Sequence, residues 1–250
     1  MKDMKPVICW TNNYKVYSFL CDNHGRLRVS SIAKFLQESA WEHAEHCGAG
    51  YKTLKPYGLV WILHGLRISI DKFPFWEDEL SLETWGKHYE SLFAYRDFEI
   101  FKTGSKIPLI QATSSWILVN ADSHKPVRIA DNLKKIPENQ RSALYSKPGN
   151  INLPDALINH EVHEVVHSDI DIYNHVNNTS YIQFCLDAAY ELHNVDSKIN
   201  AFEIKFVQEA HLGDCLKISY VRVDNTFFFQ AKNLQNNKEI FRAKAEIVVS

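Results

Sequence analysis

The chain has 250 residues, of which 45% are hydrophobic and 23% charged, as in an ordinary globular protein. Its 28 Lys and Arg against 30 Asp and Glu give a net charge near −2, which excludes a strongly basic nucleic-acid-binding protein. The five cysteines include no CxxC pair and the apolar runs are short, so we expect no disulfide framework, no metal or cofactor site and no membrane span.

An amphipathic helix followed by four strands is predicted in the first half of the chain. Residues 29–46 place Ile32, Leu36 and Ala40 along one helical stripe, and Gly48 follows as a stop signal. A short extended segment precedes this helix. The extended segment is predicted at 14–20, and the strands, which are rich in Ile, Leu, Trp, Thr and Phe, at 59–70, 79–87, 92–102 and 109–120.

The same order of elements returns after a polar linker that is too long for a hairpin. The second half is predicted to contain an extended segment at 160–166, a helix at 177–192, and strands at 201–207, 214–223, 226–234 and 239–249. Around the helices the halves align at an offset of 149 residues, which places Asp22 on Asp171. Along the strands the offset is 136 residues, which places Asp78 on Asp214.

The repeated order β-α-β-β-β-β predicts a duplication with an α+β fold. In such a fold each helix covers one face of an antiparallel sheet, and two such sheets could join into one that protects an edge of each half. We therefore expect an N-terminal domain at 1–120, a linker at 121–150 and a C-terminal domain at 151–250.

A polar cluster, HSDIDIYNHVNN at 167–178, stands directly before the second helix. Asn177 or Asn178 is predicted to cap the helix, and Asp169 to be a turn or cap residue. His175 would then lie just outside the helix N-terminus. The backbone N–H groups of the next three residues would favour negative charge on a carbonyl oxygen placed there.

The two offsets indicate that this cluster is specific to the second half. Arg26 takes the place of His175 in the first half, and Phe73 takes the place of Glu209. An acid–base pair of His175 and Glu209 is therefore predicted once per chain.

The stretch DIDIYNHVNNTSY resembles the Asp-x-Asp-x-x-x-His-Val-Asn-Asn-x-x-Tyr signature of hot-dog-fold thioesterases. The first-half segments GRLRVSSIAKFLQESAWEHA, LFAYRDFEIF and ATSSWILVNADSHKPVRI look like the acyl-acyl-carrier-protein thioesterases of bacteria and plant plastids. The resemblance covers roughly residues 14–249. It implies a tandem (double) hot-dog fold, hydrolysis of fatty acyl-acyl carrier protein to free fatty acid, and acyl carrier protein as the partner. It also implies a bacterial cytoplasmic location and a possible homodimer.

The resemblance also implies the site residues. By motif, the family's catalytic Asp, His and Glu fall on Asp171, His175 and Glu209. The family's Asn falls on Tyr173, where this sequence departs from the pattern. The neighbouring Asn174 would point to the opposite side of an extended segment. The residues that could take over the role of that Asn, or position the substrate, are Tyr173, Asn174, Asn177 and Asn178.

The mechanistic hypothesis gives Glu209 the task of orienting or deprotonating a water molecule, with His175 hydrogen-bonded to water or substrate. Asp171 would fix the imidazole ring or the backbone at the helix start. Ala210 stands where plant members have a Cys, which excludes a nucleophilic Cys at that place. The resemblance further suggests that the first half shapes the acyl pocket. We interpret four tryptophans as core or rim aromatics, some of which line that pocket: Trp61, Trp76, Trp85 and Trp116.

Two alternatives to an acyl-carrier-protein thioesterase stay open, an acyl-CoA thioesterase on the same scaffold and a non-catalytic acyl-binding module. A hot-dog dehydratase is less favoured by the first-half segments. An acidic carrier protein needs a basic surface. The basic residues that could supply it, or that could simply be solvated, are Lys34, Lys52, Lys55, Lys125, Arg128, Lys134, Lys135, Arg141 and Lys147.

Overall fold

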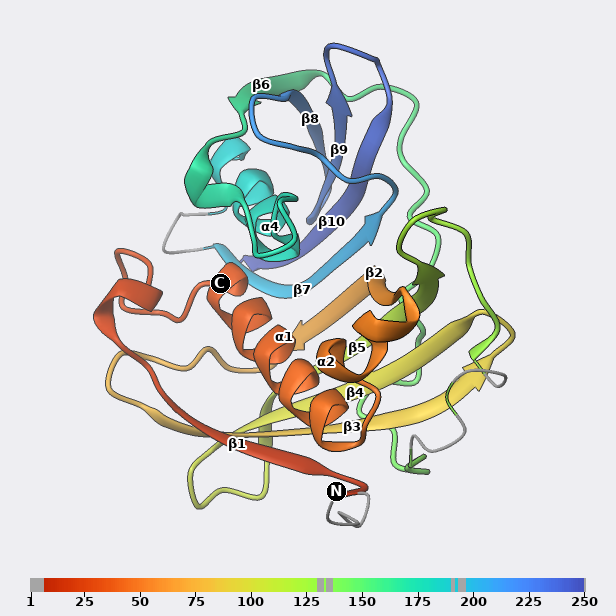
Figure 1. Cartoon of the computed structure of the whole chain (residues 1–250). Coiled ribbons are helices and arrows are strands. Elements are labelled where there is room, and N and C mark those ends of the chain that lie inside the picture. Colours follow the sequence, from red (N-terminus) through yellow and green to blue (C-terminus); the bar gives the residue numbers. More distant parts are fainter. Residues whose placement is uncertain (1–6, 130–132, 134–136, 190–191, 193–196, 250) are drawn as a thin grey trace.

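The computed structural model describes residues 7–129, 133, 137–189, 192 and 197–249. Within these residues, ten strands form one antiparallel sheet, and the helices α1 and α4 lie on the same face of it (Figure 1). The strands are β1 (Trp10–Lys15), β2 (Leu59–Ile70), β3 (Glu79–Glu90), β4 (Phe93–Lys102), β5 (Pro108–Asn120), β6 (Asn159–Glu164), β7 (Ser197–Phe206), β8 (Cys215–Val223), β9 (Thr226–Asn233) and β10 (Glu239–Val249). The helices are α1 (Val29–His46), α2 (Tyr51–Leu54) and α4 (Asn178–Ala188), with 3₁₀ turns η1 (Ser18–Leu20), η2 (Lys55–Tyr57) and η3 (His167–Asp169).

The sheet has the order β1-β3-β4-β5-β2-β7-β10-β9-β8-β6. Outward from the central β2–β7 pair, the two halves of the chain follow the same order of strands. β2 and β7 pair antiparallel, with Arg67 opposite Glu203 and Ile68 opposite Phe202. The expectation that two sheets join into one is therefore confirmed, and the joint covers an edge that each half would otherwise expose.

The helix α1 has the predicted bounds because its apolar stripe is continuous. Ile32, Leu36, Ala40 and His43 are buried along this stripe against the sheet. In the part of the chain that the structure describes, neither α1 nor any other helix combines the length and the apolar character needed to cross a membrane.

The helix α4 begins after Asn177, whose side-chain Oδ1 accepts a hydrogen bond of 2.9 Å from the N–H of Thr179. A helix cap at 177 or 178 is thus confirmed, at Asn177. α4 ends at Ala188 and not at 192 as predicted, and residues 190 and 191 lie outside the described residues.

Most strand boundaries agree with the prediction, and the exceptions have a local cause. The segment predicted as extended at 14–20 is the end of β1 followed by η1. β7 begins at Ser197, four residues before the predicted 201, because Ser197, Lys198 and Ile199 pair with β10. Pairing with a neighbouring strand imposes an extended backbone that the local residue types do not indicate.

Both halves carry the same turn before their long helix. In the first half the N–H of Asp22 donates to the carbonyl of Arg26 at 2.8 Å. In the second half the N–H of Asp171 donates to the carbonyl of His175, also at 2.8 Å. The two turns therefore superpose at the predicted offset of 149 residues.

The residue after each turn is bonded to the segment that precedes the third strand of its half. Leu27 N–H donates to the Pro74 carbonyl at 2.8 Å, and Val176 N–H donates to the Ala210 carbonyl at 2.9 Å. Pro74 and Ala210 are separated by the second predicted offset of 136 residues. The internal repeat is thus present in the hydrogen bonding as well as in the strand order.

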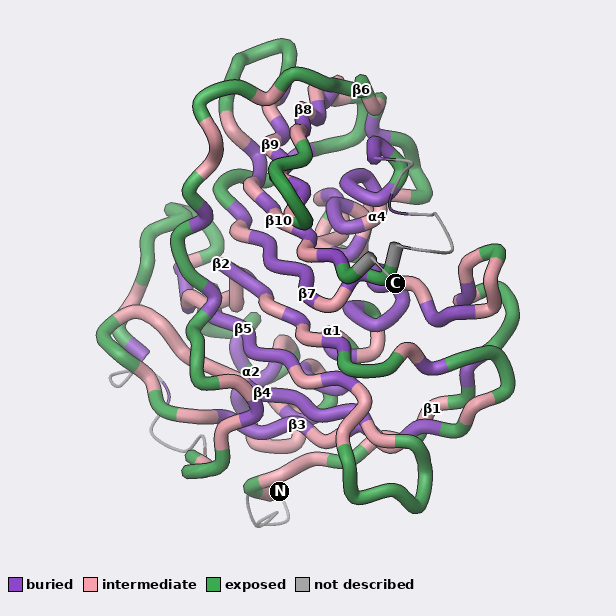
Figure 2. Tube along the Cα trace, turned by 180° about the vertical axis from the view of Figure 1, so that it is seen from behind, coloured by how far each residue is buried: buried purple, intermediate pink, exposed green. Residues whose placement is uncertain are grey.

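The later part of the linker, residues 137–150, crosses the outer face of the sheet, opposite the helices, and Figure 2 shows this face. The N–H of Ala143 donates to the buried carboxylate of Asp97 at 2.7 Å. Further along, the N–H of Gly149 donates to Glu203 Oε1 on β7 at 2.8 Å. The linker is therefore hydrogen-bonded to strands of both halves.

Candidate active site

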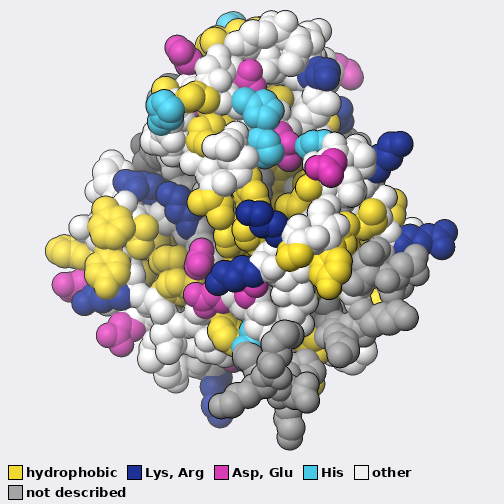
Figure 3. Space-filling model, in the orientation of Figure 1, with side chains coloured by type: hydrophobic (Ala, Val, Ile, Leu, Met, Phe, Trp, Pro, Cys, Tyr) yellow, Lys and Arg dark blue, Asp and Glu magenta, His cyan; other side chains and the backbone are white. Residues whose placement is uncertain are grey.

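A cavity of about 1010 Å³ lies where the two halves meet, and residues of α1, α2, β2 and the second-half turn at 171–175 line it. Figure 3 shows histidines gathered beside a hydrophobic hollow, with Lys and Arg side chains at its rim. The first-half wall is mostly apolar and includes Ala40, Trp41, Ala44, Leu54, Trp61 and Leu63. The second-half wall carries polar side chains among apolar ones, and the polar-tipped residues include Asp171, Tyr173, His175, Asn178, Glu209 and His211.

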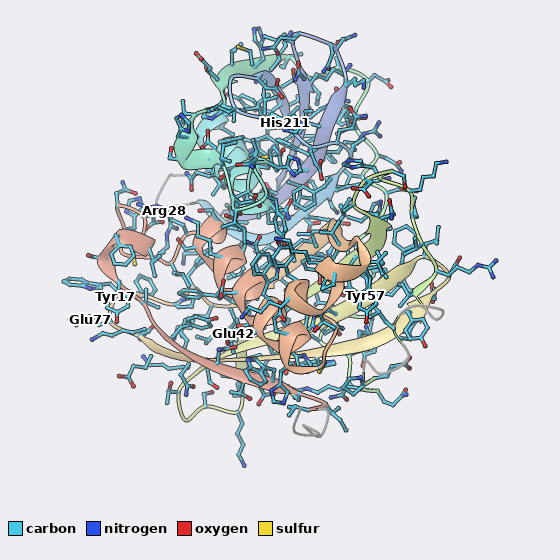
Figure 4. All side chains as sticks on the ribbon, in the orientation of Figure 1. Tyr17, Arg28, Glu42, Tyr57, Glu77 and His211 are labelled. Atoms are coloured by element: carbon cyan, nitrogen blue, oxygen red, sulfur yellow. The ribbon has the colours of Figure 1, made fainter. Side chains whose placement is uncertain are left out.

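The imidazole of His175 and the carboxylate of Glu209 meet on the polar wall. His175 Nε2 lies 3.4 Å from Glu209 Oε2, and both side chains keep about a third of their surface exposed, 30% and 37%. The ring of His211 packs edge-on against that of His175 at a centroid distance of 4.9 Å. Figure 4 labels His211, which stands two residues after Glu209 but belongs to no sequence motif that would have indicated it.

The turn at 171–175 holds His175 in place through its backbone. Asp171 Oδ1 accepts a hydrogen bond of 2.8 Å from the N–H of Tyr173, so this carboxylate fixes the turn. This bond is made within the turn and not to the backbone at the start of α4, so both tasks expected of Asp171 stay predictions. Asn174 has a φ of +62°, a left-handed conformation that Asn tolerates better than most residues.

Glu209 is positioned by the two backbone groups of its neighbour Ala210. The Ala210 carbonyl accepts from Val176 N–H at 2.9 Å, and the Ala210 N–H donates to the hydroxyl oxygen of Tyr181 at 3.0 Å. Burial raises the pKa of the Tyr181 phenol, which therefore stays neutral. Tyr181 is the last residue of the DIDIYNHVNNTSY stretch, but its contact with Ala210 could not be predicted from the sequence.

The start of α4 offers fewer free backbone donors than predicted. The N–H of Val176 is bonded to the Ala210 carbonyl, and the N–H of Asn177 donates to the Asp169 carbonyl at 2.8 Å. Two of the three donors expected to polarise a carbonyl are therefore engaged elsewhere, and that part of the prediction is wrong. Asn178 lines the cavity, and its N–H makes no hydrogen bond to the residues that the structure describes.

The residues considered as substitutes for the family's Asn do not all face the cavity. Tyr173 lines the cavity, whereas Asn174 is exposed and lies away from it. Asn177 is committed to capping α4. Asp169 is a cap, as predicted, because its Oδ2 accepts from Val166 N–H at 3.0 Å.

The corresponding turn of the first half carries no such acid–base pair. Arg26 Nε donates to Asp22 Oδ2 at 2.8 Å, and the guanidinium lies 5.7 Å from the centre of the Phe73 ring. Arg26, in a largely buried ion pair, and the ring of Phe73 thus occupy the positions that His175 and Glu209 hold in the second half.

Two of the four tryptophans line the cavity, as the acyl-pocket interpretation expects: Trp61 and Trp116. Trp85 is buried below the linker, where its Nε1–H donates to the Arg141 carbonyl at 2.9 Å. Trp76 is exposed.

Part of the expected basic surface is already paired with carboxylates. Arg141 contacts Glu83 and Glu99, and Lys147 Nζ lies 2.6 Å from Glu90. Lys134 and Lys135 lie outside the described residues. No cluster of metal-ligating side chains occurs among the residues with described positions.

A neutral histidine and an arginine lie deep in the first half, where Arg96 also lines the cavity. His43 Nδ1 accepts from Arg96 Nη1 at 2.9 Å, so His43 Nε2–H donates to the Val7 carbonyl at 2.7 Å. Burial and the neighbouring guanidinium lower the pKa of His43 to about 4, and burial lowers the pKa of Arg96 to about 10.

This lowered pKa predicts an acid-sensitive fold. Because folded His43 takes up its proton near pH 4 and an unfolded His near pH 6.5, the stabilisation is present above pH 6.5 and is lost as the pH falls toward 4. We expect this residue alone to lower the free energy of unfolding by about 2 kcal/mol between pH 7.5 and pH 5. Urea unfolding of the wild type and of His43→Gln at both pH values measures the difference.

The exposed His167 provides the matched control, because His167→Gln should leave the pH dependence of the wild type unchanged. If the free energy of unfolding falls equally between pH 7.5 and pH 5 in the wild type and in His43→Gln, the pH dependence does not come from His43.

The chain matches the family models of the acyl-ACP thioesterase N-terminal domain over residues 8–136 and C-terminal domain over residues 154–250. An acyl-ACP thioesterase from Bacteroides thetaiotaomicron is 27% identical in sequence, and its crystal structure superposes with a TM-score of 0.87. The superposition covers 96% of this chain and 98% of that one. The 12:0-ACP thioesterase from Umbellularia californica, 18% identical with a TM-score of 0.84 and 98% of both chains covered, shares the fold.

Among curated relatives, oleoyl-acyl carrier protein thioesterase 2 from Arabidopsis thaliana is 26% identical over 190 residues. The match covers 64% of this chain and 48% of the relative, so the chain spans about half the length of the curated relatives it matches. The expected α+β double hot-dog fold is confirmed by the solved structures. With both family models matched in order, this chain belongs to the acyl-ACP thioesterase family.

Proposed function

We propose that this chain hydrolyses the thioester of a fatty acyl chain on acyl carrier protein, releasing a free fatty acid and the carrier thiol. One observation carries the proposal. The pair of His175 and Glu209, 3.4 Å apart, opens into a cavity whose opposite wall is apolar. A thioester held at the pair would have its acyl chain in contact with the apolar wall. Membership in the family supports the same reaction.

In the proposed reaction, Glu209 accepts a proton from a water molecule while the water oxygen bonds to the thioester carbonyl carbon. The negative charge that develops on the carbonyl oxygen is stabilised by Asn178 N–H at the α4 N-terminus. His175 hydrogen-bonds to the water or to the substrate. The carbon–sulfur bond then breaks, and the thiolate leaves and takes up the proton that Glu209 accepted, which restores the carboxylate. General-base assistance of this kind contributes about 10²–10⁴-fold to the rate.

Two further residues act in this proposal by positioning the pair. Asp171 holds the turn that carries His175 through the Tyr173 N–H. Tyr181 holds Ala210, and with it Glu209, from the buried face of α4. Neither side chain needs to touch the substrate.

The test compares one acyl chain on two carriers. We expect kcat/KM for the chain on acyl carrier protein to exceed that for the same chain on coenzyme A by about tenfold or more, a difference of about 1.4 kcal/mol. Equal or faster hydrolysis of the coenzyme A thioester would favour an acyl-CoA thioesterase. Acyl binding without release of thiol would favour a non-catalytic acyl-binding module.

The location in the bacterial cytoplasm and the homodimer stay predictions. The similarity to a thioesterase from Bacteroides thetaiotaomicron supports a bacterial setting. Sedimentation of the purified chain over a range of concentrations measures the oligomeric state.

A further inference from the structure

Tyr173 connects the turn that carries His175 to the first half of the chain. Its ring packs edge-on against Trp41 of α1 at a centroid distance of 5.7 Å and an interplanar angle of 78°. It packs in the same way against Tyr51 of α2, at 5.3 Å and 84°. Edge-to-face pairs of this kind are favourable beyond the area that they bury. The three rings therefore form one aromatic cluster, and all three line the cavity.

The position of Tyr173 in the turn places it beside the proposed reaction centre. Asp171, Tyr173 and His175 line the cavity, whereas Ile172 and Asn174 are exposed. Tyr173 is thus the cavity residue next to His175 on the side of the first-half wall. A thioester carbonyl held at His175, with its chain directed along the apolar wall, would bring its first carbons past this cluster.

Chemically, the cluster suits an unsubstituted alkyl chain. Burial, with the nearby Tyr51 and Asp171, raises the pKa of Tyr173 to about 12, so the phenol carries no charge that would repel an apolar chain. Its backbone is fixed by the bond to Asp171, and its ring is held on two sides. A rigid wall of this type responds to a single extra methyl group.

We propose that Tyr173, supported by Trp41 and Tyr51, is a specificity-determining residue that selects acyl chains without a branch at the carbons next to the thioester. This role rests on the proposed function, which sets the direction in which the acyl chain runs from His175 along the apolar wall. It gives the residue that replaces the family's Asn a steric role in substrate selection.

The test measures the ratio of kcat/KM for a straight acyl chain to that for the 2-methyl chain of equal length, both on acyl carrier protein. We expect Tyr173→Ala to shift this ratio toward the branched chain by about tenfold or more, the usual effect of one methyl group in a pocket. Tyr173→Asn, which places a smaller polar residue on the same turn, should shift it in the same direction. Tyr173→Phe keeps the ring and should keep the wild-type ratio.

Tyr57 provides the matched control, because it is a tyrosine near α2 that is 75% exposed and does not line the cavity. Figure 4 labels it on the segment that joins α2 to β2. Tyr57→Ala should leave the ratio unchanged. The proposal is overturned if Tyr173→Ala and Tyr173→Asn both keep the ratio within about twofold of the wild type, well below the roughly tenfold lower end of the effects known for one methyl group.

A binding measurement separates this inference from the proposed function. Non-hydrolysable thioether analogues are made of the straight and the 2-methyl acyl chain, both on acyl carrier protein. The ratio of their Kd values can be measured even for a variant that has lost turnover. A wild type that hydrolyses neither thioester refutes the proposed function alone. A Kd ratio that does not respond to the loss of the Tyr173 ring refutes the specificity role alone.

Discussion

Glu209→Gln is expected to lower kcat on carrier-bound acyl chains by at least about 100-fold, because glutamine cannot accept a proton from water. His175→Ala is expected to have an effect of similar size. Both side chains are partly exposed, at 37% and 30%, so the variants should unfold at the temperature of the wild type. Steady-state kinetics together with thermal unfolding separates loss of chemistry from loss of fold.

A double variant makes this prediction sharper. If the two groups act on one water molecule, Glu209→Gln combined with His175→Ala should cost little more than the more damaging single change. Glu161→Gln, which changes an exposed carboxylate on the edge strand β6, is the control and should keep full activity. Near-normal turnover in both single variants would refute the assigned roles.

Phe202→Ala is expected to lower the free energy of unfolding by about 3–5 kcal/mol. Phe202 lies on β7 at the joint of the two halves, opposite Ile68 of β2 and Ala245 of β10, with 0% of its surface exposed. Removing the ring leaves a cavity at the centre of the ten-stranded sheet. The hydrogen-bonded strands on both sides prevent the neighbouring side chains from moving in to fill it. Urea unfolding at neutral pH gives the value.

Phe19→Ala is the matched control, because the same ring on η1 is 72% exposed. We expect it to change the stability by no more than about 0.5 kcal/mol. Similar losses in the two variants would show that the β2–β7 joint is not where the stability is concentrated.

Elements with a strong local pattern could be predicted, and elements formed by a distant partner could not. The bounds of α1 follow from its apolar stripe. The first residues of β7 were missed because Ser197 and Lys198 do not indicate a strand by themselves and become extended by pairing with β10. The early end of α4, at Ala188, was also missed.

The same distinction applies to the candidate site. The repeat offsets and the family resemblance indicated that His175 and Glu209 belong together, and the structure brings them to 3.4 Å. The use of the Val176 and Asn177 N–H groups could not be predicted, because their acceptors lie elsewhere in the fold. The bond from Ala210 to Tyr181 joins residues 29 positions apart and has no local signal.

The two matching turns belong to one polypeptide, and this has a consequence for how the site can vary. In an assembly of identical subunits, one substitution alters every copy of a turn at once. Here a change at Arg26 or Phe73 leaves the other copy untouched. Substitutions in the first-half turn can therefore accumulate independently of those in the second-half turn. In a family with this duplicated fold, one turn can become purely structural while the other keeps the candidate catalytic residues.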